Sequence, residues 1–164
     1  MSADPPPVAA LDPAAHASVN PIDFVVDAGV AIKWYVPEIH EADAKRFLNS
    51  AWNLHVPELF YPEFGNILWK KARLLKTPEI TEVEGREILN LLLGVALTVH
   101  PMGPLLTTAF KLAVSAARAT VYDSCYLVLA KALNCRLVTA DRVFFDSLKS
   151  GPFGSHLVWV ADPV

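Results

Sequence analysis

The chain has 164 residues, of which 53% are hydrophobic and 19% charged, and its formal net charge is -3. This length and composition predict one globular domain with a sizeable core, and they exclude a largely disordered chain. The small negative charge excludes a strongly basic surface, so any nucleic acid would have to meet a local cluster of lysine and arginine side chains.

The beginning of the sequence differs in composition from the rest. Residues 1–21 hold five of the 13 prolines, and we expect a flexible tail there, followed by one folded domain over residues 22–164. We see no signal peptide, and the apolar stretch at 88–99 is too short to span a membrane. Cys125 and Cys135 are expected to be buried, reduced thiols. These features predict a cytoplasmic protein.

Strand-like and helix-like segments alternate from residue 22 onward. Short apolar runs predict strands at 23–27, 53–57, 95–101, 135–139 and 157–160. Apolar residues at helical spacing predict helices at 29–36, 41–51, 62–75, 81–93, 103–119 and 120–133. Strands separated by helices pair in parallel through right-handed crossovers. We therefore predict a three-layer α/β/α sandwich with a central, mostly parallel sheet of about five strands.

Local signals fix some helix starts and exclude some sites. Pro62 suits a first helical turn, and Thr81 followed by Glu84 is a capping-box pattern. The sequence has neither GxGxxG after the first strand nor a P-loop, so a nucleotide site is not predicted. The five histidines lack zinc-site spacing.

Four carboxylates come from segments that reach one edge of the predicted sheet. Asp27 ends the first strand, Asp141 follows the fourth, and Glu63 and Asp123 lie in the first turns of helices. Ligands bind beyond the carboxyl ends of parallel strands, so we expect these acids to lie together. Each alone can be explained as a helix cap or as an acid that stabilises a helix dipole. Clustered like charges, however, cost stability unless a cation lies among them. Carboxylate oxygen favours Mg²⁺ or Mn²⁺, and such a site suits phosphodiester hydrolysis.

Three stretches that contain these acids match a known pattern in order and spacing. They read VVDAGVAIKWYVPE (25–38), VPELFYPEFGNILWKKAR (56–73) and TVYDSCYLVLAKALNCRLVTAD (120–141). Together they resemble the PIN domain, and within it the VapC-type toxins of toxin–antitoxin pairs. The resemblance implies a Mg²⁺- or Mn²⁺-dependent endoribonuclease, a small VapB-like antitoxin as partner, RNA as substrate, and a homodimer.

The resemblance also implies how the acids would act. Asp27 and Asp123 would be metal ligands, and Glu63 and Asp141 would bind the metal directly or through water. Gly29 departs from the pattern, because such proteins often carry a small polar residue there. A hydroxyl that would help to orient a metal-bound water is therefore absent.

Other residues near the motifs have two readings each. Thr139 would steady the pocket by hydrogen bonding, or it is an ordinary strand residue. Asn66, one helical turn after Glu63, would face the pocket or cap nearby groups. Lys33 and Arg142 are expected to bind RNA phosphates. Further flanking candidates are Lys70, Lys71, Arg73 and Arg118. Trp34, Trp52 and Trp69 are expected in the core, and for Trp34 and Trp52 a groove for the antitoxin is the alternative.

Two alternatives remain open. The first is a catalytically weak PIN-like module that binds RNA or protein, and Gly29 is the feature that favours it. The second is a phosphoryl-accepting receiver domain, which also gathers acids at strand ends. That reading requires several acids after the first strand and a lysine after the last, whereas here one aspartate follows the first strand and LVWVADPV holds no lysine.

Overall fold

A computed structural model of the chain describes residues 22–74, 77–116 and 119–164, and shows five strands in one sheet. The strand order is β3-β2-β1-β4-β5, and every neighbouring pair is parallel. The strands are β1 (Ile22–Val26), β2 (Trp52–Pro57), β3 (Leu97–His100), β4 (Arg136–Thr139) and β5 (Leu157–Trp159). The predicted fold class is confirmed. The tail predicted at residues 1–21 lies outside the described residues.

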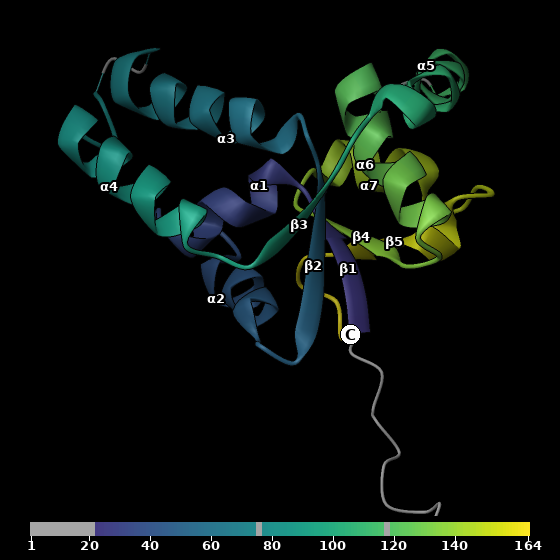
Figure 1. Ribbon diagram of the computed structural model, residues 1–164, viewed down its shortest axis with the longest axis horizontal. Coiled ribbons are helices and arrows are strands. Elements are labelled where there is room, and N and C mark those ends of the chain that lie inside the picture. The colour runs from purple at the N-terminus through teal and green to yellow at the C-terminus, as the bar shows by residue number, and fades with distance from the viewer. Residues whose placement is uncertain (1–21, 75–76, 117–118) are drawn as a thin grey trace, which may run out of the picture.

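Helices cover both faces of this sheet (Figure 1). The α-helices are α1 (Ala28–Ala31), α2 (Glu41–Lys45), α3 (Phe60–Trp69), α4 (Glu82–Leu93), α5 (Leu106–Ser115), α6 (Val121–Ala132) and α7 (Arg142–Leu148). Short 3₁₀ helices lie at Ile32–Trp34, Arg46–Leu48, Gly103–Leu105 and Gly154–His156, and a π-helical segment at Lys70–Leu74 continues α3. Figure 1 shows the sheet nearly edge-on, with α1 to α4 on one side and α5 to α7 on the other.

Several predicted helices are shorter than the apolar spacing suggested. The segment 29–36 is one α-helical turn followed by a 3₁₀ turn, and Pro37 disfavours helical backbone in the residue before it. The segment 41–51 ends at Leu48 because Asn49 is extended and its side-chain oxygen accepts a hydrogen bond from the Ala51 N–H at 3.0 Å. The helix predicted from residue 103 begins with a 3₁₀ turn and its α-helical part ends at Ser115.

Other local predictions are accurate. Pro62 lies in the first turn of α3, although that helix begins two residues earlier than predicted, at Phe60. The capping box of α4 is present: Thr81 N–H donates to Glu84 Oε2 at 2.7 Å, and Glu84 N–H donates to Thr81 Oγ1 at 3.2 Å. Two backbone N–H groups at the start of this helix thereby gain acceptors.

The core lies on both sides of the central strands. Residues Phe24, Val25 and Val26 of β1 are fully buried, and so is most of α6. Trp34 is buried and its Nε1–H donates to Ala44 O at 3.0 Å, while Trp52 packs against Phe24 with ring centroids 5.2 Å apart. Trp34 thus belongs to the core, whereas Trp52 is only partly buried and packs at the edge of the core, and Trp69 is half exposed.

The burial predicted for the two cysteines is confirmed. Cys125 and Cys135 are buried, free thiols. Within the described ranges, every helix is too short or too polar to cross a lipid bilayer.

Candidate active site

A pocket of about 500 Å³ opens at the carboxyl edge of the sheet, and all four predicted acids line it. Asp27 directly follows β1 and Asp141 follows Ala140 after β4, whereas Glu63 lies in the first turn of α3 and Asp123 in the first turn of α6. Because β1 and β4 are neighbours in the sheet, their carboxyl ends bring Asp27 and Asp141 to the same place. The structure therefore brings the four acids to one pocket.

Asp27 is the most perturbed of these acids. It is the N-cap of α1, and its Oδ1 accepts a hydrogen bond from Val30 N–H at 2.6 Å. Burial raises its pKa from 3.8 to about 7, against hydrogen bonds from Thr139 and Val30 that favour the charged form. The negative charges of Glu63 and Asp123 contribute to the same rise in pKa. A cation beside Asp27 would reverse this effect, since opposite charge favours the ionised carboxylate.

Glu63 is held by a residue of α6, which lies on the other side of the sheet. The buried Tyr126 side chain donates its hydroxyl to Glu63 Oε2 at 2.6 Å. Burial raises the pKa of Glu63, and the charge of Asp123 adds to this, whereas the bond from Tyr126 and the charge of Lys70 lower it. Burial and the adjacent Glu63 also raise the pKa of Tyr126, so the tyrosine stays protonated and keeps its role as donor.

Asp123 and Asp141 both fill helix-capping positions. Asp123 and Thr120 form a second capping box: Thr120 N–H and Thr120 Oγ1–H donate to Asp123 Oδ2, at 3.0 and 2.7 Å. Asp141 is the N-cap of α7, and its Oδ1 accepts from Phe144 N–H at 2.9 Å. The second oxygen of each aspartate makes no hydrogen bond with any residue that the structure describes. Both aspartates therefore cap helices, as the alternative explanation holds. Each still has a second oxygen that can bind a ligand.

The donor set fits a hard divalent cation. Carboxylate oxygens are the ligands that Mg²⁺ and Mn²⁺ prefer, and the raised pKa values of Asp27 and Glu63 come partly from neighbouring negative charge. Among the described residues, no three His, Cys, Asp or Glu side chains stand close enough to hold one ion together. Water would therefore supply part of the coordination of such an ion, as is usual for Mg²⁺.

The two predicted supporting residues differ in their placement. Thr139 is buried at the end of β4, where its Oγ1 accepts from Asp141 N–H at 3.1 Å and its hydroxyl bonds to Asp27. It thus connects two of the acids. Asn66 is exposed on α3 and does not line the pocket.

The predicted RNA-binding cations also differ. Lys33 lines the pocket, but Arg142 does not: its side chain is mostly exposed, pairs with Asp146 at 2.9 Å and lies over the ring of Trp159 at 5.2 Å. Of the further candidates, Lys70 and Lys71 line the pocket and Arg73 does not. Arg118 lies outside the described residues.

Sequence reasoning missed three polar residues of this pocket, Tyr126, Glu38 and Glu79. Tyr126 follows Asp123 by three residues, a spacing that puts both on one helix face, so the signal was present in the sequence. Glu38 lies in a loop and pairs with Lys33 and Lys71, and no periodicity announces such a contact. At Gly29 a β-carbon would stand 3.3 Å from Asp27 Oδ1, so a side chain there would press directly on that carboxylate.

Comparisons with known proteins bear on the family and the fold of the chain. The family model of the PIN domain matches residues 24–149. Ribonuclease VapC3 of Pyrobaculum aerophilum is 38% identical over 123 residues, which cover 73% of this chain and 89% of that protein. The solved structure of PAE2754 from the same organism has a TM-score of 0.58 and 25% identity, covering 79% of this chain and 82% of the other. A toxin–antitoxin complex from Klebsiella pneumoniae shares the fold, with a TM-score of 0.57, 13% identity, and coverage of 85% and 98%.

Proposed function

This chain belongs to the PIN domain family, with VapC-type proteins as relatives, and on that premise we propose that it is a metal-dependent endoribonuclease toxin. The observation that carries the proposal is the pocket lined by Asp27, Glu63, Asp123 and Asp141, which come from four separate segments. The relative that is 38% identical bears the name ribonuclease, which supports RNA as the substrate.

We assign Mg²⁺ or Mn²⁺ as the cofactor, held by Asp27 and Asp123 directly and by Glu63 and Asp141 directly or through water. When bound, such an ion lowers the pKa of a water and stabilises the leaving oxygen of a phosphodiester. The residues of the chain orient this centre. Tyr126 fixes one oxygen of Glu63 by its hydroxyl.

Thr139 acts on two of the acids at once. Its hydroxyl bonds to Asp27 and accepts from the backbone of Asp141, so it links the carboxyl ends of β1 and β4. Lys33 and Lys70 line the same pocket and supply positive charge for RNA phosphates, which the four carboxylates would otherwise repel.

The test is cleavage of a labelled single-stranded RNA by the purified chain in Mg²⁺, with EDTA as the metal-free arm. Asp27→Asn and Asp123→Asn should each reduce cleavage by about a hundredfold or more, as expected for groups that hold the reacting centre. A matched control is Asp146→Asn, because Asp146 pairs with Arg142 outside the pocket. Equal cleavage by both pocket variants and the control would remove the proposed site.

We further propose that a VapB-like antitoxin binds this chain and that the chain forms a homodimer. Large apolar side chains are exposed on α4 and α5, and such surfaces mark contacts with partners. They are Val83, Leu91, Leu93, Leu106, Phe110 and Val114. Light scattering of the purified chain, alone and after co-expression with the antitoxin, would report both associations.

A catalytically weak PIN-like module that binds RNA or protein is the second candidate. The capping bonds of Asp27, Asp123 and Asp141 favour it, because they explain those residues without a metal. Calorimetry with Mn²⁺ separates the two: heat of binding that Asp27→Asn abolishes supports the enzyme, and no binding by the unmodified chain supports the module.

A further inference from the structure

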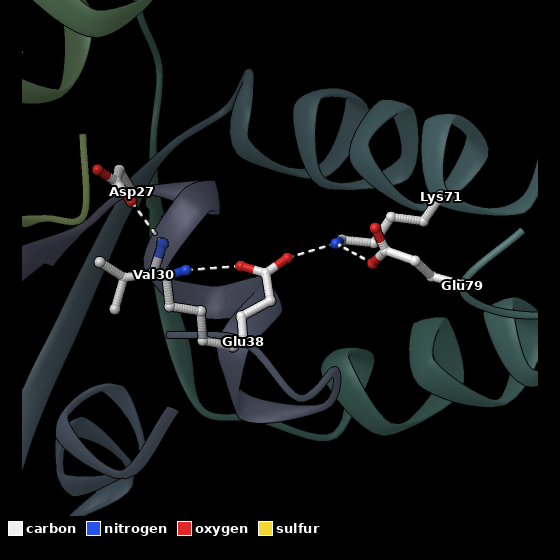
Figure 2. Close-up of polar contacts among 6 residues, drawn as sticks. Asp27, Val30, Glu38, Lys71 and Glu79 are labelled. Atoms are coloured by element: carbon white, nitrogen blue, oxygen red, sulfur yellow. Dashed lines mark hydrogen bonds and ion pairs between the residues drawn. The ribbon is translucent and has the colours of Figure 1, made fainter. Parts of the chain in front are cut away.

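Two lysines and two glutamates that have no part in the proposed metal site line the same pocket. Lys33 Nζ donates to Glu38 Oε2 at 2.6 Å, and Lys71 Nζ is paired with the other oxygen, Glu38 Oε1. Lys71 also donates to Glu79 Oε2 at 2.6 Å. Figure 2 shows the Glu38 carboxylate bonded on both sides, with Lys71 joining it to Glu79. One carboxylate therefore bridges two ammonium groups within the pocket.

The bridge holds charges that are largely removed from water. The Lys33 and Lys71 side chains are each only 12% exposed and that of Glu38 is 24% exposed, whereas Glu79 is 44% exposed. Burial disfavours the charged forms, but the mutual bonds prevail, so the pKa of Lys71 is raised and that of Glu38 is lowered. Without Glu38, Lys33 would lose the carboxylate with which it pairs. Lys71 would keep only its more exposed contact with Glu79.

The lysines come from separate parts of the chain, and both keep donors to spare. Lys33 lies in the 3₁₀ turn after α1, and Lys71 lies in the π-helical segment after α3. An ammonium group has three N–H donors. Lys33 uses one of them and Lys71 uses two in the bonds described here. Three donors thus remain for an acceptor in the pocket.

We propose that Glu38 is a positioning residue, which holds Lys33 and Lys71 so that their remaining N–H groups bind an RNA phosphate next to the one that is cleaved. The proposal rests on the proposed ribonuclease function. A phosphate oxygen accepts from such fixed ammonium groups at a lower cost in side-chain entropy than from free lysines.

The first test measures RNA binding without cleavage. A short, fluorescein-labelled single-stranded RNA of mixed sequence is titrated in EDTA, and Kd is read from fluorescence anisotropy. Glu38→Gln should raise Kd about tenfold, because both lysines lose the bridge that orders them. Loss of one negative charge alone would tighten binding, so charge cannot produce this result. The matched control Glu79→Gln, which removes only the exposed partner of Lys71, should stay within about twofold. Unchanged or tighter binding by Glu38→Gln overturns the proposal.

The second test separates positioning from a general loss of structure. In Mg²⁺, Glu38→Gln should raise KM and keep kcat within about twofold, because it removes binding that is equal in ground and transition states. Lys33→Met and Lys71→Met should each lower the slope of log Kd against log salt by about one. The two lysine variants judge the proposal even if the glutamine variant fails to fold. Slopes equal to that of the unmodified chain contradict it.

The outcomes also separate this inference from the proposed function. An unmodified chain that binds the RNA in EDTA but does not cleave it in Mg²⁺ refutes the ribonuclease, and the binding titrations still decide the role of Glu38. An unmodified chain that binds no RNA refutes the inference itself.

Discussion

Replacement of Asp27 by asparagine should make the fold more stable at neutral pH while it removes activity. Asparagine caps a helix as well as aspartate does, so the bond to Val30 N–H is retained. The folded pKa of Asp27 is about 7 and its ordinary value is 3.8, so between these values the folded state holds a proton that the unfolded state has lost. The stability that the protonated Asp27 carboxyl contributes is therefore fully present below the ordinary pKa, and it is lost as the pH rises through the folded pKa. The whole rise corresponds to about 4 kcal/mol.

The assay is urea unfolding followed by circular dichroism in EDTA. Between about pH 5 and about pH 8, the Asp27 carboxyl should cost the unmodified chain roughly 2.5 kcal/mol of unfolding free energy, and Asp27→Asn should lack that loss. Mn²⁺ at the higher pH should restore stability to the unmodified chain but not to the variant, because a bound ion favours the charged carboxylate. The reasoning is refuted if both proteins lose the same free energy between the two pH values.

Three further perturbations test the site. Tyr126→Phe removes the hydroxyl bond to Glu63, so the pKa of Glu63 should rise further and the acidic limb of the kcat/KM profile should move to higher pH; an unmoved limb contradicts this. Thr81→Ala should cost about 1 kcal/mol of unfolding free energy through the capping box of α4 and leave cleavage within about twofold. Thr120→Ala should cost a similar amount of unfolding free energy but also reduce cleavage, because it frees the Asp123 side chain to rotate. Equal cleavage by the two threonine variants would contradict this.

The sequence predicts the sheet and its acidic edge because both depend on periodic or local signals. Buried β-branched runs mark the strands, and an acid after a strand or at a helix start lies near the carboxyl edge in any parallel sheet. The capping box of Thr81 and Glu84 can be predicted for the same reason, since it is a contact between residues three apart in the sequence. These features need no knowledge of distant contacts.

The rest depends on contacts that span long stretches of sequence. Glu38 and Lys71 are separated by α2, β2 and α3, and only the folded chain brings them together. Arg142 neighbours a pocket acid in sequence, yet the start of α7 directs it toward Asp146 and Trp159. Proximity in sequence therefore identifies the acids more reliably than it identifies the cations that accompany them.

The central position of β1 has a consequence for synthesis of the chain. β1 pairs with β2, which follows closely, but its other neighbour, β4, is made only when most of the polypeptide has left the ribosome. Asp27 is thus translated early and waits for Asp141 until then. A nascent chain that ends before β4 therefore lacks Asp141, and the pocket with all four acids forms only after β4 has been made.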